Sequence, residues 1–119
     1  MSKCLNLCYI ESGDHMKIIV SNKEIPLHVA DNYFKRLKGL MFKKNIDYAL
    51  IFKKCNGIHT FFMKEEIDII LTDKNNNILY TYTNLKPWKI ILPKKNVYNT
   101  YELPKGSITK KIESIKITE

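Results

Sequence analysis

The chain has few of the residues that mark specialised architectures. Its 119 residues include only four glycines, none in a Gly-x-Gly spacing, which excludes a glycine-rich phosphate-binding loop. Its three cysteines are an odd number without framework-like spacing, which favours reduced thiols in a cytoplasmic protein over a disulfide-rich secreted one. No apolar run reaches about 18 residues, so we expect no membrane-spanning helix.

The N-terminal segment has little of the character of a signal peptide. The mixed run over residues 4–10 is short and interrupted by an asparagine, and no small-residue cleavage site follows it. Residues 11–14 can be encoded by a purine-rich stretch that resembles a ribosome-binding site before Met16. We therefore expect residues 1–15 to be a leader outside the native protein and residues 16–119 to form a single domain.

Acidic residues are too few to balance the basic ones. Twenty Lys and Arg against twelve Asp and Glu give a formal net charge of +8. Lysine, isoleucine and asparagine are all abundant, which is typical of an AT-rich genome, and we expect a bacterial source. A basic surface attracts polyanions in general, but no recognised RNA- or DNA-binding motif accompanies the charge. Nucleic-acid binding is therefore not our first expectation.

Short apolar runs separated by polar turns predict a mostly β domain. The expected strands are residues 16–20, 25–30, 48–52, 67–72, 78–83, 97–103 and 112–117, and the first two are expected to form a β-hairpin across residues 21–24. Asp31 or Asn32 can cap a short helix that runs to about Lys38, with Gly39 as its stop. The sequence therefore predicts an α+β, mostly β fold, in which a small, open, barrel-like mixed sheet carries one short helix.

The segment from Gly57 to Asp73 places polar groups among residues that favour burial. Asp68 stands between two isoleucines in an expected strand, where a carboxylate without a partner is costly. Arg36 is the only arginine, and its planar fork suits a carboxylate. We interpret Arg36 as the partner of Asp68, holding the helix to the sheet, with capture of a ligand's carboxylate or phosphate as the alternative.

His59 is the other polar group of this segment. Cys55 stands four residues earlier, but a zinc site needs more ligands than this pair supplies. Cys55 also lacks the sequence signature of a nucleophile. We therefore predict no metal and no cofactor, and we expect His59 in the wall of a pocket. Met63 is typical of core packing, and Trp88 is expected to be partly exposed at the rim.

Three ordered motifs resemble one known family. They are Arg-Leu-Lys-Gly-Leu-Met at 36–41, His-Thr-Phe-Phe-Met at 59–63 followed by Ile67 and Asp68, and Glu-Leu-Pro-Lys-Gly at 102–106. Together they resemble the domain of unknown function 192 family from about Met16 onward. The resemblance implies a compact, mostly β, barrel-like domain with its motif residues around one cleft, and it implies no activity. The matching positions are Arg36, Gly39, Met41, His59, Met63, Asp68, Glu102 and Gly106.

The chain departs from this family pattern in two places. Many relatives resemble proteins that are exported or attached to a membrane through an N-terminal segment. This chain has no convincing segment for export or membrane attachment. The family often has Gly-Asp in the final turn, where this chain has Lys-Lys-Ile-Glu at 110–113.

We therefore predict a non-catalytic ligand- or partner-binding module. Its polar cleft would be formed by Arg36, His59 and Asp68, with Met63, Trp88 and Glu102 as further lining residues. Three further motif positions would have a structural role, namely Gly39, Met41 and Gly106. Gly106 would supply a turn with positive φ. The expected partner is a small anionic ligand or a peptide segment that presents a carboxylate, without membrane contact.

Two alternatives stay open. One is a small hydrolase-like or metal-dependent enzyme that uses His59 as acid or base and Asp68 to orient it. The other is a basic polyanion-binding protein, whose binding would depend steeply on salt.

Overall fold

The computed structural model of the chain describes residues 16–30, 40–109 and 115–118. In order, the elements of these residues are β1 (Lys17–Val20), β2 (Lys23–Val29), β3 (Ala49–Lys53), β4 (Ile58–His59), β5 (Ile67–Thr72), β6 (Ile78–Leu85), β7 (Ile90–Ile91), β8 (Asn99–Pro104) and β9 (Lys116–Thr118). No helix occurs among them. The mostly β prediction is confirmed, whereas the expected helix, with Arg36 and Gly39, lies outside the described residues.

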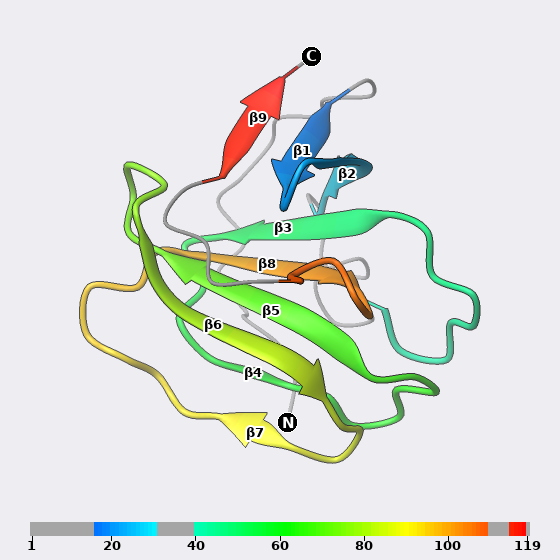
Figure 1. Cartoon of the computed structure of the whole chain (residues 1–119). Helices are drawn as coiled ribbons and strands as arrows, with labels where there is room; N and C mark the ends of the chain where they lie inside the picture. The colour runs from blue at the N-terminus through cyan, green and yellow to red at the C-terminus, as the bar shows by residue number, and fades with distance from the viewer. Residues whose placement is uncertain (1–15, 31–39, 110–114, 119) are drawn as a thin grey trace.

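Seven strands form one curled sheet in the order β6-β5-β8-β3-β2-β1-β9, and β4 and β7 form a separate pair. Figure 1 shows the sheet as an open half-barrel, with β4 and β7 along its lower side. β2 and β3 run parallel, and the other pairs are antiparallel. The predicted barrel-like mixed sheet is therefore confirmed.

Local sequence explains the best-predicted elements. β1 and β2 form the expected hairpin, in which Ser21 and Asn22 make a two-residue turn with φ of 50° and 65°. β5 lies between β6 and β8, and all six of its residues are buried, as its continuous apolar sequence predicts. β4 and β7 were not predicted, because two residues show no periodicity.

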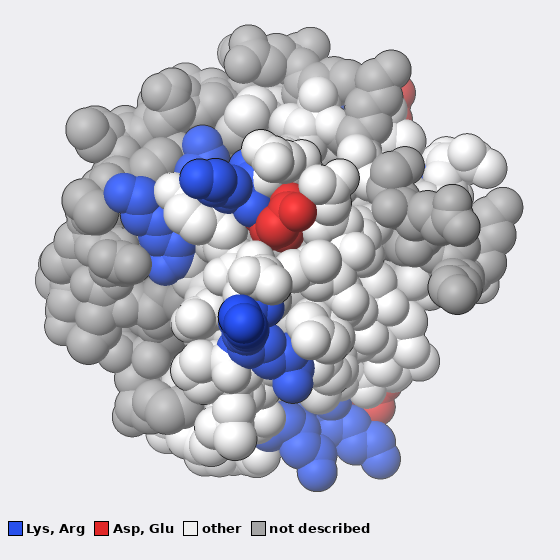
Figure 2. All heavy atoms as spheres, turned by 90° about the vertical axis from the view of Figure 1, so that its left-hand side faces the viewer, with Lys and Arg blue, Asp and Glu red and all other residues white. Residues whose placement is uncertain are grey.

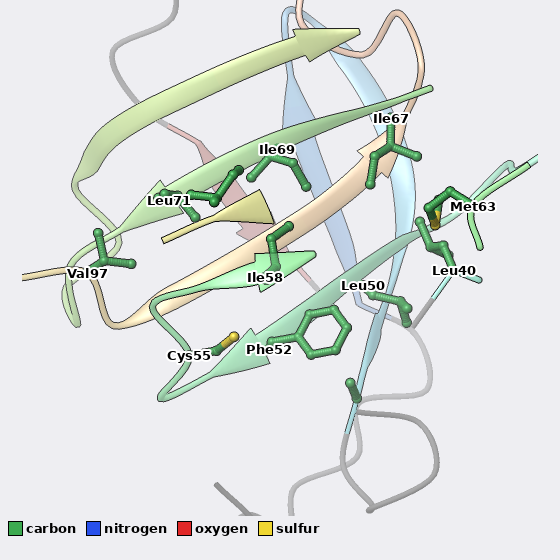
Figure 3. Close-up of a cluster of buried hydrophobic side chains, with 12 residues drawn as sticks. Leu40, Leu50, Phe52, Cys55, Ile58, Met63, Ile67, Ile69, Leu71 and Val97 are labelled. Atoms are coloured by element: carbon green, nitrogen blue, oxygen red, sulfur yellow. The ribbon is translucent and has the colours of Figure 1, made fainter. Parts of the chain in front are cut away.

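The alternation of side chains along the strands divides the core in two. On one face, the Phe52 core contains Ala30, Leu40, Leu50, Phe52, Cys55, Ile58, Met63, Ile67, Ile69, Leu71, Ile91 and Val97. On the other, the Tyr101 core contains Ile18, Val20, Ile25, Leu27, Val29, Ala49, Ile51, Ile70, Tyr101, Leu103 and Ile108. Figure 3 shows that β4 covers the Phe52 core, with Ile58 pointing at the sheet. The strand pair therefore closes this face.

Basic side chains form separate groups on the face of the molecule that Figure 2 shows, with an acidic group between them. The ion pairs Lys17–Glu24 and Lys105–Glu66 are 3.5 and 3.8 Å long and largely exposed, so each contributes little to stability. In the described part of the chain, no helix is long and apolar enough to cross a membrane.

Candidate functional site

Asp68 is fully buried and its charge is stabilised by two backbone amides. Its Oδ1 accepts a hydrogen bond from the Asn84 N–H and its Oδ2 from the Ile108 N–H, each at 2.9 Å. Asn84 belongs to a bulge, because β6 has one extra residue between the partners of Ile67 and Ile69. Its φ of 53° fits that irregularity. Asp68 thus holds the bulge of β6 through the Asn84 amide. The predicted pairing with Arg36 lies outside the described residues and stays a prediction.

The second amide bound by Asp68 follows the turn of the third motif. In this turn the Ser107 N–H donates to the Pro104 carbonyl at 3.2 Å, and Gly106 has φ of 83°, which confirms the predicted positive φ. The Lys23 ammonium donates to the Gly106 carbonyl at 2.8 Å. Asp68 therefore fixes both an edge bulge and the motif turn, which is a structural role.

The structure does not bring Asp68 and His59 together. Asp68 alternates with Ile67 and Ile69, so it points to the side of the Tyr101 core, whereas β4 lies over the Phe52 core. Glu102 pairs with Ile69 and points to the Phe52 side. It is fully buried on β8. The predicted lining residues are thus divided between the two faces of the sheet.

Glu102 also acts on a neighbouring tyrosine. Burial, followed by the Asp47 and Glu102 carboxylates, raises the pKa of Tyr48 above its ordinary value of 10.0. Whether Glu102 touches a ligand stays a prediction.

His59 is buried and positioned by the backbone that follows it. Only 2% of the residue is exposed, and its Nδ1 accepts a hydrogen bond from the Phe61 N–H at 3.1 Å. An accepting Nδ1 carries no proton, so the neutral imidazole has its hydrogen on Nε2. The ring stacks on Phe61, with centroids 4.6 Å apart. His59 therefore begins a series of stacked rings rather than facing solvent.

Two further expectations concern the sulfur-containing residues Met63 and Cys55. Met63 packs in the Phe52 core, as its usual role predicts. Cys55 packs in the same core. The reduced state of its thiol and a cytoplasmic location stay predictions. Within the described ranges, no three His, Cys, Asp or Glu side chains are placed to share a metal ion.

Three exposed rings continue the series from His59 to the surface. Phe42, Phe62 and Trp88 are 55, 48 and 59% exposed, and we call them the aromatic platform. Trp88 stacks on Phe61 at 5.3 Å and meets the Phe62 ring at 4.7 Å, and Phe62 lies 5.6 Å from Phe42. The predicted exposure of Trp88 is confirmed. The platform is therefore one continuous group of rings.

Each platform residue stands in a turn with a left-handed backbone. The φ angles of Phe42, Phe62 and Trp88 are 64°, 63° and 66°. The other described residues with positive φ, apart from Gly106, are Ser21, Asn22, Asn45, Lys54, Asn76, Asn84 and Asn96. Asn tolerates this region, but a bulky ring there costs about 1 kcal/mol or more. The strain thus coincides with the three exposed rings.

The turns themselves share a pattern. The Lys43 N–H donates to the Leu40 carbonyl, and the Met63 N–H donates to the Thr60 carbonyl, both at 3.2 Å. In each turn the platform residue is the third of four, a position where type II turns require glycine or asparagine. Aromatic residues are conformationally disfavoured at this turn position, so backbone preference does not explain why Phe42 and Phe62 stand there.

Thr60 joins two of these turns. Its hydroxyl donates to the Lys86 carbonyl at 2.7 Å and accepts from the Lys89 N–H at 2.9 Å, bridging the ends of the turn that presents Trp88. Its carbonyl accepts the Trp88 N–H at 3.0 Å as well as that of Met63. Thr60 therefore orients the platform while being fully buried itself.

The third turn is attached to the second. The Phe42 N–H donates to the Phe62 carbonyl at 3.0 Å. Glu65 accepts the N–H of Asn45 at 2.9 Å and that of Ile46 at 3.3 Å, one on each carboxylate oxygen. The rings are consequently held in place before any partner arrives, as binding surfaces require.

Sequence reasoning found Trp88, and it predicts that one of Phe61 and Phe62 lies in the core while the other lines a cleft or a partner surface; the exposed ring is Phe62. It did not find the roles of Phe42 and Thr60. Pro87 before Trp88 was a usable turn signal, because proline favours the second position of such turns. Nothing comparable marks Phe42 or Phe62. The hydrogen bonds of Thr60 join residues 26 and 29 positions apart, which no local pattern reveals.

Comparison with solved structures supports the fold. A Novosphingobium aromaticivorans protein of unknown function superposes with a TM-score of 0.70 at 13% identity, covering 100% of this chain and 99% of that one. A Sinorhizobium meliloti protein that has been put forward as a transcription regulator gives 0.71 at 14% identity, covering 92% and 94%. At these identities the similarity concerns the fold alone.

Sequence comparison identifies curated relatives in archaea, whereas we expected a bacterial protein. A UPF0127 protein of Pyrococcus horikoshii is 43% identical over 86 residues, or 67% of this chain and 73% of that protein. One from Pyrococcus furiosus is 39% identical over 98 residues, or 76% and 83%. The matched region spans 55% of a Thermococcus sibiricus relative that is 36% identical over 67% of this chain. The DUF192 family model, described as "Uncharacterized ACR", matches residues 16–114. The chain belongs to the DUF192 family.

Proposed function

We propose that this protein is a non-catalytic binding domain whose contact surface is the aromatic platform. The observation that carries the proposal is the coincidence of exposure and strain at Phe42, Phe62 and Trp88. An exposed ring gains little from folding, and a left-handed backbone at the same residue is unfavourable. Features that oppose stability at three adjacent positions are typical of a functional surface.

The charge around the platform favours an anionic partner. Five lysines lie within two residues of the three rings, namely Lys43, Lys44, Lys64, Lys86 and Lys89, and no Asp or Glu does. All except the half-buried Lys43 are exposed. A small anionic ligand with an apolar part, or a peptide segment that presents a carboxylate beside apolar side chains, suits this combination.

The enzyme alternative receives less support. Both Asp68 oxygens accept backbone amides, and this carboxylate points away from the side that carries His59. The imidazole is buried beneath Phe61. General acid–base work needs a group within reach of a substrate, so His59 fits better as support for the stacked rings. A ligand-binding role for Arg36 stays a prediction outside the described residues.

Anilinonaphthalene sulfonate, an aromatic anion, tests the proposal, with energy transfer from Trp88, the only tryptophan, as the readout. The decisive variant is Phe62→Asn, since asparagine tolerates positive φ and leaves Trp88 in place. Tyr80→Asn is the control, because Tyr80 is 43% exposed on β6. We expect saturable binding by the native protein and the control, and binding about tenfold weaker for Phe62→Asn. Equal affinities, or no energy transfer, would overturn the proposal.

A further inference from the structure

We infer that the aromatic platform, together with Ile90 and Leu92, docks on the surface of an anionic lipid bilayer. The inference rests on the proposed function and names the partner of the same surface. It departs from the expectation of no membrane contact, and it is carried by the exposed apolar side chains at one end of the molecule and by the exposed lysines next to them in the chain.

Exposed apolar side chains are concentrated at this end. Seven large hydrophobic residues are exposed in the described ranges, and five of them are the platform residues with Ile90 and Leu92. Ile90 and Leu92 are 48 and 69% exposed and flank Ile91, which is buried in the Phe52 core. They therefore point away from the core. Figure 1 shows β7 and the turn between β6 and β7 along the lower edge of the molecule.

The chemistry of this surface suits hydrocarbon better than nucleic acid. Bases bind by stacking on free ring faces, but one face of Trp88 already stacks on Phe61, and the Phe62 ring also contacts Trp88. Ile90 and Leu92 offer no ring at all. A bilayer interface accepts both kinds of side chain, because aromatic rings settle at the headgroup level and aliphatic groups enter the acyl boundary.

The lysines next to the platform in the chain provide the electrostatic attraction to an anionic bilayer. Four exposed ammonium groups, at Lys44, Lys64, Lys86 and Lys89, lie next to the apolar residues in the chain. Lysines at an anionic bilayer surface add attraction that falls off within a Debye length. Apolar contact by the platform, with exposed lysines next to it in the chain, predicts binding that requires anionic lipid and weakens as salt rises.

Co-sedimentation with vesicles tests the inference on the full chain. The two preparations are phosphatidylcholine alone and phosphatidylcholine mixed with an equal amount of phosphatidylglycerol. We expect binding to the mixed vesicles only, and we expect acyl-chain bromolipid in those vesicles to quench Trp88 emission. Binding without quenching would mean charge attraction alone and would overturn the inference. Tighter binding to a single-stranded oligonucleotide would also overturn it.

Two matched pairs of variants locate the contact. Leu92→Asn is compared with Leu79→Asn, which changes an exposed leucine on β6, and Lys64→Glu is compared with Lys74→Glu in the turn after β5. We expect binding about fivefold or more weaker for the Leu92 and Lys64 variants, and a change below about twofold for the controls. If each variant lost as much vesicle binding as its control in both pairs, the inference would be overturned. If anilinonaphthalene sulfonate still binds the platform while vesicles do not, the proposed function stands without the membrane.

Discussion

The Thr60 carbonyl accepts the Trp88 amide at 3.0 Å, across 28 positions of the chain. The Thr60 hydroxyl completes the attachment by bridging Lys86 and Lys89 on either side. The turn that presents Trp88 is thus held by the residue that follows β4, so the two turns are joined by direct hydrogen bonds. This explains how an exposed tryptophan keeps an unfavourable backbone.

Replacing Thr60 by valine should release the Trp88 turn. The change keeps the shape of the side chain but removes two partly buried hydrogen bonds of the Thr60 hydroxyl, so we expect the unfolding free energy to fall by about 2 kcal/mol. We also expect Trp88 emission to shift to the red, because the ring leaves Phe61. Fluorescence and urea denaturation measure both effects.

Thr100→Val provides the control for this prediction. Thr100 is also fully buried, and its hydroxyl donates to the Cys55 carbonyl at 2.9 Å in another part of the fold. Loss of this hydrogen bond should lower the unfolding free energy without shifting the emission wavelength of Trp88. An unchanged spectrum for Thr60→Val would show that the hydroxyl does not position the turn.

Asp68→Asn should destabilise the domain severely. An amide offers one acceptor where two backbone N–H groups converge, so a donor is left facing a donor, and we expect a loss of about 3 kcal/mol. Urea denaturation measures it, with Asp47→Asn as the exposed control. A loss no larger than that of the control would mean that other groups satisfy the amides of Asn84 and Ile108.

Acid should weaken the turn between β5 and β6. Hydrogen bonds from the Asn77 side chain, then from the backbone of Asn77 and Asn75, lower the pKa of Asp73 below its usual 3.8. A lowered folded pKa adds stability that is present above the ordinary value and is lost as pH falls through the folded one. The melting temperature of Asp73→Asn should therefore approach that of the native protein between pH 5 and the acid limit of folding. A constant difference across that range would contradict this role.

The sequence predicted the fold where local patterns decide it. The β1–β2 hairpin, the buried β5 and the positive φ of Gly106 follow from alternation, continuous apolar runs and turn chemistry. The site was less accessible, because the partners of Asp68 are backbone amides 16 and 40 positions away. Asp68 reads as a site residue from its charge alone, whereas the structure gives that charge a structural partner.

The platform was the least predictable part for a physical reason. Phe62 takes a backbone conformation that its own side chain disfavours, so any inference from residue preference points elsewhere. Its position depends on the hydrogen bond that the Phe42 N–H donates to its carbonyl from a different loop. Sequence alone therefore placed the rim at Trp88 and missed Phe42 and Thr60.

The unfolding free energy of Phe62→Asn addresses most directly whether the exposed rings serve binding rather than stability. Asparagine tolerates the left-handed backbone and removes an exposed apolar ring, so urea denaturation should give a free energy equal to that of the native protein or up to about 1 kcal/mol higher. A decrease of more than about 1 kcal/mol would show that the Phe62 ring stabilises the fold, and the platform would then lose its claim to be a binding surface.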